Sequence, residues 1–211
     1  MSESEPLVLN PEDTALVVAF PQMGMVKEDM TFGKAYPGQM ETMQSGFGNA
    51  INVANEAPEG VEMAVIKGEY TGENNARYPR NLADMLRSSA ERALISTLAG
   101  DATIISTTGE NAGEHTNGKY AEWLAERAGE GCRFVLVVGG TADNGLKFAV
   151  LPVVAAGMTP VVIRQCSAAR AGYFEKPADG GPDRFEKTMQ MLEEAGAIVV
   201  NNATDIRWLG C

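Results

Sequence analysis

Short, continuous runs of hydrophobic residues, rich in Val and Ile, recur along the chain. Because hydrophobic and polar residues do not alternate within them, both faces of each run should be buried, as in the strands of a parallel sheet. The runs predict six strands, at residues 15–20, 62–67, 102–106, 134–139, 160–164 and 197–201.

Between these runs, hydrophobic residues return at the spacing of one helix face. The stripes predict helices over residues 40–54, 82–98, 120–128, 143–157 and 185–195. Strands that alternate with helices favour an α/β fold, a doubly wound, six-stranded parallel sheet with helices on both faces. The Met and aromatic residues of the stripes are then core, and ligands are expected beyond the carboxyl ends of the strands.

The length and the net charge of the chain limit the number of domains and the classes of partner. A chain of 211 residues suits a single domain over residues 1–211. The net charge of −11 and the pI near 4.6 argue against nucleic acid or an anionic membrane surface as a partner. No hydrophobic run approaches the roughly 18 residues of a spanning helix, and the start "MSESEPLVLN" does not read as a signal peptide.

Three cysteines without paired spacing fit a reducing compartment, so we expect a cytoplasmic protein. A single histidine and no close Cys/His cluster offer little for a metal site, and we expect neither a metal nor a cofactor. Cys166, at the end of a predicted strand, is more typical of a small buried residue than of a nucleophile.

The segment "FVLVVGGTADNGLKFAVLPVVAAGM" predicts a buried strand, a tight glycine turn and a helix. Main-chain amides at the start of that helix would point at a ligand, with the helix dipole behind them. Gly140 and Gly145 have the spacing of a phosphate loop, but Leu146 and Lys147 replace its Lys and Ser/Thr, so nucleotide binding is not favoured.

Three segments in the same order resemble the isochorismatase-like, or cysteine hydrolase, superfamily. They are "NPEDTALVVAFPQMGMV" near the start, "VLVVGGTADNGLKFAVLPVVAAGMTPVVIRQCSAA" and the tail "FEKTMQMLEEAGAIVVNNATDI". The resemblance implies a six-stranded parallel sheet with helices on both faces, in agreement with the hydrophobic pattern.

The resemblance also implies a catalytic triad of Asp, Lys and Cys, and this chain lacks all three. The Asp position falls on Phe20, the Cys position on Gly145, and the Lys position at Ser106 or Thr107. A Gly in the Cys position is known in the isochorismatase branch, which cleaves a vinyl ether by proton transfer. That branch keeps the Asp, and a Phe side chain transfers no proton.

The surrounding positions match the family better. The resemblance implies that the amides of residues 141–145 turn into a ligand site, often beside a cis peptide bond. The predicted ligand site consists of Phe20, Gln22, Gly140, Thr141, Asp143, Asn144 and Gly145. His115 follows the third strand and is a candidate acid or base, although a lone His in a polar loop is more often solvated or a cap.

Two functions remain open. One is a hydrolase-like enzyme with altered, non-triad chemistry on a small planar or polar metabolite. The other is a non-catalytic member that binds a small molecule or serves as a subunit beside an active homologue. The resemblance also favours a homo-oligomer, with the 82–98 stripe as one candidate contact.

Overall fold

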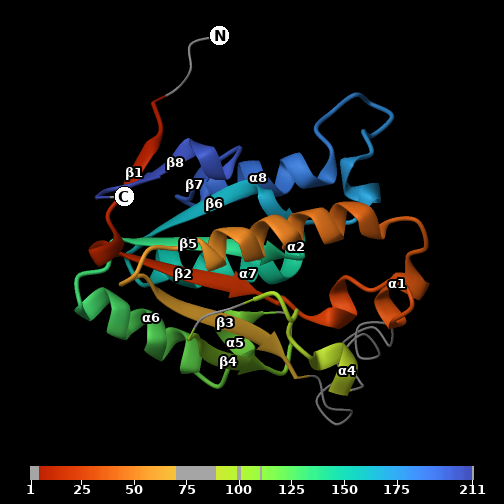
Figure 1. The fold of residues 1–211 in the computed structure, drawn as a ribbon. Helices are drawn as coiled ribbons and strands as arrows, with labels where there is room; N and C mark the ends of the chain where they lie inside the picture. Colours follow the sequence, from red (N-terminus) through yellow and green to blue (C-terminus); the bar gives the residue numbers. More distant parts are fainter. Residues whose placement is uncertain (1–4, 70–88, 99–100, 110, 211) are drawn as a thin grey trace.

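The computed structural model describes residues 5–69, 89–98, 101–109 and 111–210 (Figure 1). Six strands form one parallel sheet in the order β4-β3-β2-β5-β6-β7, which confirms the predicted fold class. The strands are β2 (Thr14–Ala19), β3 (Glu62–Gly68), β4 (Thr103–Thr107), β5 (Phe134–Gly140), β6 (Thr159–Ala168) and β7 (Ile198–Val200).

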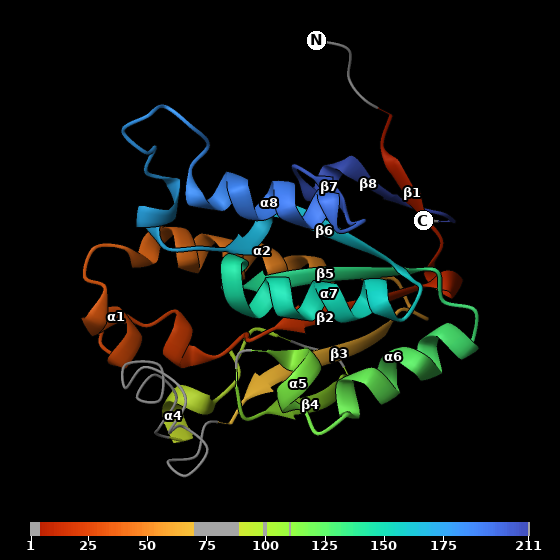
Figure 2. The ribbon, with the colours of Figure 1, turned by 180° about the vertical axis from the view of Figure 1, so that it is seen from behind.

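Helices cover both faces of this sheet. Helix α2 (Met40–Asn55) crosses one face, where Ala50 packs with Leu16 and Val18 of β2 (Figure 1). The opposite face of the sheet, seen in Figure 2, is covered by α5 (Ala112–His115), α6 (Lys119–Gly129), α7 (Lys147–Ala155) and α8 (Arg184–Glu194). Every residue of β2 is buried, which explains why its sequence is hydrophobic without alternation.

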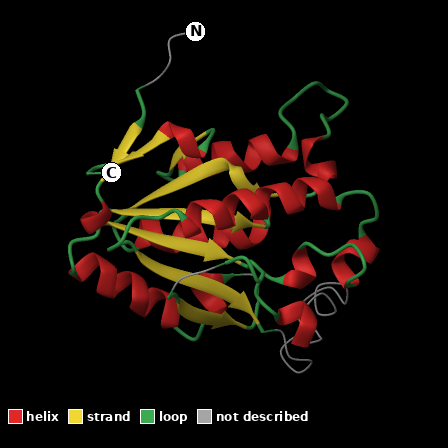
Figure 3. Ribbon diagram, viewed as in Figure 1, coloured by secondary structure: helices red, strands yellow, loops and turns green. Residues whose placement is uncertain are grey.

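Shorter elements complete the described chain (Figure 3). The sequence pattern did not predict a second, two-stranded parallel sheet formed by β1 (Leu7–Leu9) and β8 (Ile206–Trp208). Each strand has only three residues, too few for a periodic signal. The remaining short helices are α1 (Thr31–Ala35), α4 (Ser89–Arg92), η1 (Pro11–Asp13), η2 (Met23–Met25), η4 (Ala142–Leu146), η5 (Ala171–Phe174) and η6 (Ala203–Asp205).

The helix predicted over 82–98 is right at Ser89–Arg92 and wrong over residues 93–98. Residues 82–88 lie outside the described part of the chain. Helix α4 ends at Arg92, and Leu94 then forms an antiparallel bridge with Gln22. The amide of Ile95 donates to the carbonyl of Pro21 at 2.8 Å, so the loop after β2 binds this segment in extended form. Tertiary hydrogen bonds override its helical spacing.

The other helices follow their predicted ranges closely, with one change of geometry. The helix predicted over 143–157 opens as a π-helical turn, η4, before it becomes α7. In this turn the amide of Leu146 donates to the carbonyl of Thr141, five residues back, at 3.0 Å. Single π turns of this kind often occur at functional sites.

The strand order places the candidate site. From β2 the chain builds outward to β3 and β4, then returns to β5 on the other side of β2. The boundary between β2 and β5 is therefore the topological switch point, where ligands of such sheets bind. Phe20 follows β2 and Thr141 follows β5. Among the described residues, no helix has the length and hydrophobicity needed to cross a membrane.

Candidate functional site

The turn after β5 is built by two glycines. Gly139 has a φ of 108°, a conformation that side chains disfavour, and a Cβ there would lie 2.9 Å from the main-chain nitrogen of Ala19. At Gly140 a Cβ would lie 3.2 Å from the ring of Phe47 on α2. The Gly140–Thr141 peptide bond is cis, as the resemblance implied. The two glycines thus let the end of β5 lie close to β2 on one side and to α2 on the other.

The amides at the start of this turn differ in their hydrogen bonds. Those of Asn144 and Leu146 donate to the carbonyl of Thr141, at 3.1 and 3.0 Å. That of Thr141 donates to no main-chain acceptor within the described part of the chain. A free amide next to a helix start is a usual donor to a carbonyl or carboxylate oxygen. Thr141 and Asn144 are partly exposed.

Phe20 occupies the space in front of Gly145. Its main chain has a φ of 53°, an unusual value for a bulky residue, fixed by hydrogen bonds from Phe20 N–H to Ile66 and from Gln22 N–H to the Phe20 carbonyl. A Cβ placed on Gly145 would lie 2.6 Å from Cδ2 of the Phe20 ring and would also collide with the carbonyl oxygen of Gly140. The two positions that the resemblance assigned to base and nucleophile therefore pack against each other, and that assignment stays a prediction.

Ser106 and Thr107, where the resemblance placed the family lysine, carry uncharged side chains. Ser106 and Thr107 end β4, and the hydroxyl of Thr107 donates to the carbonyl of Gly109 at 2.7 Å. Lys67 lies beside Ser106 on the neighbouring strand, but its ammonium pairs with Glu69 at 3.0 Å. The cation nearest to Ser106 along the neighbouring strand is therefore already paired.

Gln22 is a structural clamp. It is fully buried, its Nε2 donates to the carbonyls of Gly68 (3.0 Å) and Arg92 (3.1 Å), and its Oε1 accepts from the Gly68 amide at 2.7 Å. All three partners are main-chain groups, so this side chain ties β3 and α4 to the loop after β2. Its predicted ligand contact stays a prediction, and would require these bonds to break.

His115 and Cys166 lie apart from the turn in sequence and differ in their surroundings. His115 ends α5, is half-buried, and its main chain bonds to Asn111 and Thr108. Its catalytic role stays a prediction. Cys166 is fully buried in β6, and burial raises the pKa of its thiol to about 12. This thiol is a packing group, as predicted.

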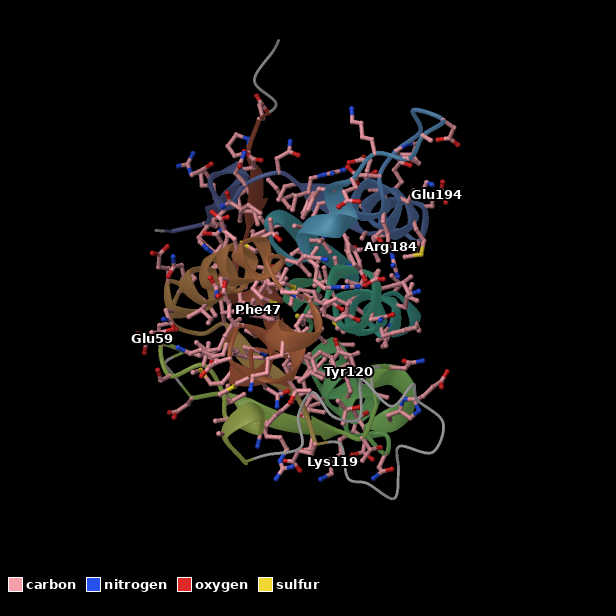
Figure 4. The ribbon with its side chains drawn as sticks, turned by 90° about the vertical axis from the view of Figure 1, so that its right-hand side faces the viewer. Phe47, Glu59, Lys119, Tyr120, Arg184 and Glu194 are labelled. Atoms are coloured by element: carbon pink, nitrogen blue, oxygen red, sulfur yellow. The ribbon has the colours of Figure 1, made fainter. Side chains whose placement is uncertain are left out.

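Asp143 links the turn to a cluster that the sequence did not predict. Its Oδ2 accepts from the Tyr173 hydroxyl at 2.8 Å and pairs with the guanidinium of Arg184, while its Oδ1 is buried without a partner in the described chain. Arg170 and Arg184 both stack on the Tyr173 ring. Figure 4 faces the carboxyl ends of the strands and labels Arg184 at the start of α8.

One sequence feature marks this cluster. The stretch "SAARAGYFEK" begins in the last residues of β6 and mixes Arg with aromatic residues directly beyond its carboxyl end. It has no helical or alternating period, so the hydrophobic pattern does not indicate it. Within the described part of the chain, no group of three or more His, Cys, Asp or Glu side chains is placed to hold a metal ion.

Comparison of the sequence identifies no relative: no protein-family model and no curated protein matches the chain. Solved structures do match. PnC1 from L. infantum, solved in complex with nicotinate, aligns over 97% of this chain and 100% of its own with a TM-score of 0.70 and 15% identity.

Two further matches carry related names. An isochorismatase from Pseudomonas putida covers 96% of this chain and 93% of its own, with a TM-score of 0.65 and 15% identity. A nicotinamidase/pyrazinamidase from Acinetobacter baumanii covers 90% and 97%, with a TM-score of 0.64 and 13% identity. At such identities the likeness concerns the fold. This chain has the fold of the isochorismatase-like hydrolases.

Proposed function

We propose that this protein binds a small planar molecule at the turn after β5 and lacks the covalent hydrolysis of triad-bearing relatives. The observation that carries the proposal is the contact between the Phe20 ring and Gly145. It leaves no room for a nucleophile at 145 and puts a hydrocarbon ring in place of the base. The amide of Thr141 remains to hold a carbonyl or carboxylate oxygen.

One protein of the same fold supports this choice of ligand. The L. infantum protein of the same fold was solved with nicotinate, a flat aromatic acid. An aromatic side chain such as Phe20 favours flat, apolar ring systems over extended polar chains. We therefore take nicotinamide and nicotinate as the first probes.

Binding and turnover are tested separately. Ammonia release from nicotinamide should not exceed that of buffer, whereas thermal denaturation with nicotinamide or nicotinate should show stabilisation that saturates. Asn144→Leu, at a partly exposed position of the turn, should weaken this stabilisation. Thr103→Val is the control, because Thr103 is exposed at the start of β4, at the end of the sheet that lies away from the turn. Stabilisation that is equal in both variants would place binding elsewhere and favour the subunit role.

A second function, hydrolysis without the triad, is favoured by one observation. Asp143 lies two residues before Gly145 and has a buried carboxylate oxygen without a partner in the described chain. A carboxylate in that state can take a proton from a bound water or substrate. Steady turnover of an amide or ester that disappears in Asp143→Asn, with the fold intact by circular dichroism, would establish this function. His115→Gln tests the other predicted acid or base in the same assay.

A further inference from the structure

A stack of aromatic rings and guanidinium groups lies at the same end of the sheet as the turn. The guanidinium carbon of Arg170 is 3.8 Å from the ring centre of Tyr36 and 5.0 Å from that of Tyr173. That of Arg184 is 4.4 Å from the ring centre of Tyr173. These are cation–π distances, so the rings hold both cations in place.

The main chain around Arg170 is also fixed. The hydroxyl of Thr42 on α2 donates to the carbonyl of Ala169 at 2.7 Å, and the amide of Ala171 donates to the carbonyl of Gln39 at 3.4 Å. The residues on both sides of Arg170 are thus tied to the start of α2. A cation held in this way loses little further conformational entropy when it binds an anion.

The charges of this cluster do not cancel. Within the described residues, Arg170 has no carboxylate within ion-pair distance, and its Nη2 donates to the neutral hydroxyl of Tyr173 at 3.3 Å. Arg184 shares the single carboxylate of Asp143, and its side chain is still 61% exposed. The two guanidinium groups and the carboxylate of Asp143 sum to a formal charge of +1, on a protein whose total is −11. The carboxylate of Glu175 lies near Gly172 but forms no ion pair with Arg170.

Stacking leaves the donors of a guanidinium available. The N–H groups of Arg lie in the plane of the guanidinium, whereas the rings cover its faces, so the edge can still bind two oxygens of one anion. We propose that Arg170, with Arg184 beside it, is a binding site for the oxyanion of a small carboxylate or phosphate compound. The site goes beyond the proposed function and does not depend on it.

Benzoate and inorganic phosphate are the probes, and benzamide is the neutral analogue of benzoate. Titration calorimetry at low ionic strength should give saturable binding of at least one of the two anions. Benzamide should bind at least ten-fold more weakly than benzoate if the carboxylate is the ligand group. Binding of phosphate alone would support the oxyanion site and assign it to phosphate compounds. The absence of saturable binding for both anions would overturn the proposal.

Variants locate the binding. Arg170→Met, which keeps a chain that packs between the rings, should weaken anion binding at least ten-fold, and Arg170→Lys should weaken it less. The matched control is Arg133→Met, since Arg133 also stacks on an aromatic ring, Phe134, at 5.5 Å but lies at the start of β5. Equal losses in both Met variants, or none in Arg170→Met, would contradict the site.

If Arg170→Met does not fold, the site can still be tested on the wild-type protein. Benzoate or phosphate should shift the amide resonances of Arg170, Ala171 and Tyr173 in a two-dimensional NMR titration. Asn144→Leu should leave these shifts unchanged, which separates this site from the turn of the proposed function. Shifts confined to other residues would overturn the assignment.

Discussion

The ring of Phe20 fills the space that a side chain at Gly145 would occupy. A side chain at 145 would meet the ring at 2.6 to 2.9 Å, closer than real carbon atoms approach. Phe20 reaches this place because its main chain adopts a positive φ of 53° at the end of β2. Phe20 and Gly145 are therefore one packing unit, and a larger side chain at 145 would disturb the ring of Phe20.

A double-mutant cycle measures this relationship. Gly145→Ala should lower the free energy of unfolding by about 1–3 kcal/mol, because its Cβ overpacks against Phe20 and the carbonyl of Gly140. Phe20→Ala should cost about 3 kcal/mol through loss of a buried ring. The double variant should be more stable than the sum of the two losses predicts, by about 0.5–2 kcal/mol.

Urea denaturation of the four proteins gives the coupling free energy. The matched control pairs Gly145→Ala with Phe148→Ala, a partly buried ring on α7 that does not appear among the atoms nearest to Gly145. Additive losses for Phe20 and Gly145 would mean that the clash with Gly140 alone excludes a side chain. A Gly145→Val variant would fill the space beside the turn, but the same clash would strain the turn itself, so it could not test ligand binding.

Gln22 should be required for stability rather than for binding. Gln22→Met keeps the size of the side chain but leaves the amide of Gly68 and the carbonyls of Gly68 and Arg92 without their partner. Unpaired buried main-chain groups cost about 1–3 kcal/mol each, so we expect a total loss of about 2–4 kcal/mol in urea denaturation. If Gln22→Met retains wild-type stability and loses ligand binding, its predicted ligand contact is right.

The sequence predicted the sheet because burial on both faces leaves a direct trace. Each central strand reads as an unbroken Val- and Ile-rich run, and β2 is buried throughout. Elements fixed by distant hydrogen bonds leave no such trace. The chain from Ala93 to Ile95 has helical spacing but is drawn out by main-chain bonds to Met23 and Pro21.

The site was predicted in part for the same reason. Gly139 and Gly140 could be found because close approach of main chains demands glycine, and Phe20 and Gly145 because they replace residues of a family pattern. The contact between these last two depends on a single positive φ, which no local pattern encodes. Arg170 and Tyr173 lie in an aperiodic segment and meet only through tertiary packing.

Asp143 should anchor α8 and η5 to the turn. Asp143→Ala removes the acceptor of the Tyr173 hydroxyl and the partner of Arg184. Because Tyr173 is buried and Arg184 is largely exposed, most of the expected loss of about 1–3 kcal/mol comes from the unsatisfied hydroxyl. Tyr173→Phe in the Asp143→Ala background should recover part of it. Hydrogen exchange should show faster opening at the start of α8, and unchanged exchange there would contradict the anchor.

Cys166 should resist alkylation in the folded protein. With a pKa raised to about 12, only about one thiol in ten thousand is ionised at pH 8, and the side chain is fully buried. Iodoacetamide at pH 8 should leave Cys166 unmodified by mass spectrometry until urea unfolds the chain. Incubation with amide or ester substrates should likewise trap no acyl adduct on it. An adduct at Cys166 in the folded protein would show a reactive thiol.

The same pKa shift predicts how stability depends on pH. The unfolded thiol ionises near pH 9 and the folded one near pH 12, so the fold favours the neutral form. Its contribution is fully present below about pH 9 and is lost as the pH rises toward 12, by at most about 1.4 kcal/mol per pH unit. Burial also raises the pKa of Tyr120, which adds a loss that begins above pH 10. Burial also raises the pKa of Cys132, so two thiols contribute above pH 9. Urea denaturation between pH 8 and pH 10 should therefore show a decline that Cys166→Ala reduces, whereas a decline of equal slope in that variant would assign it to other groups.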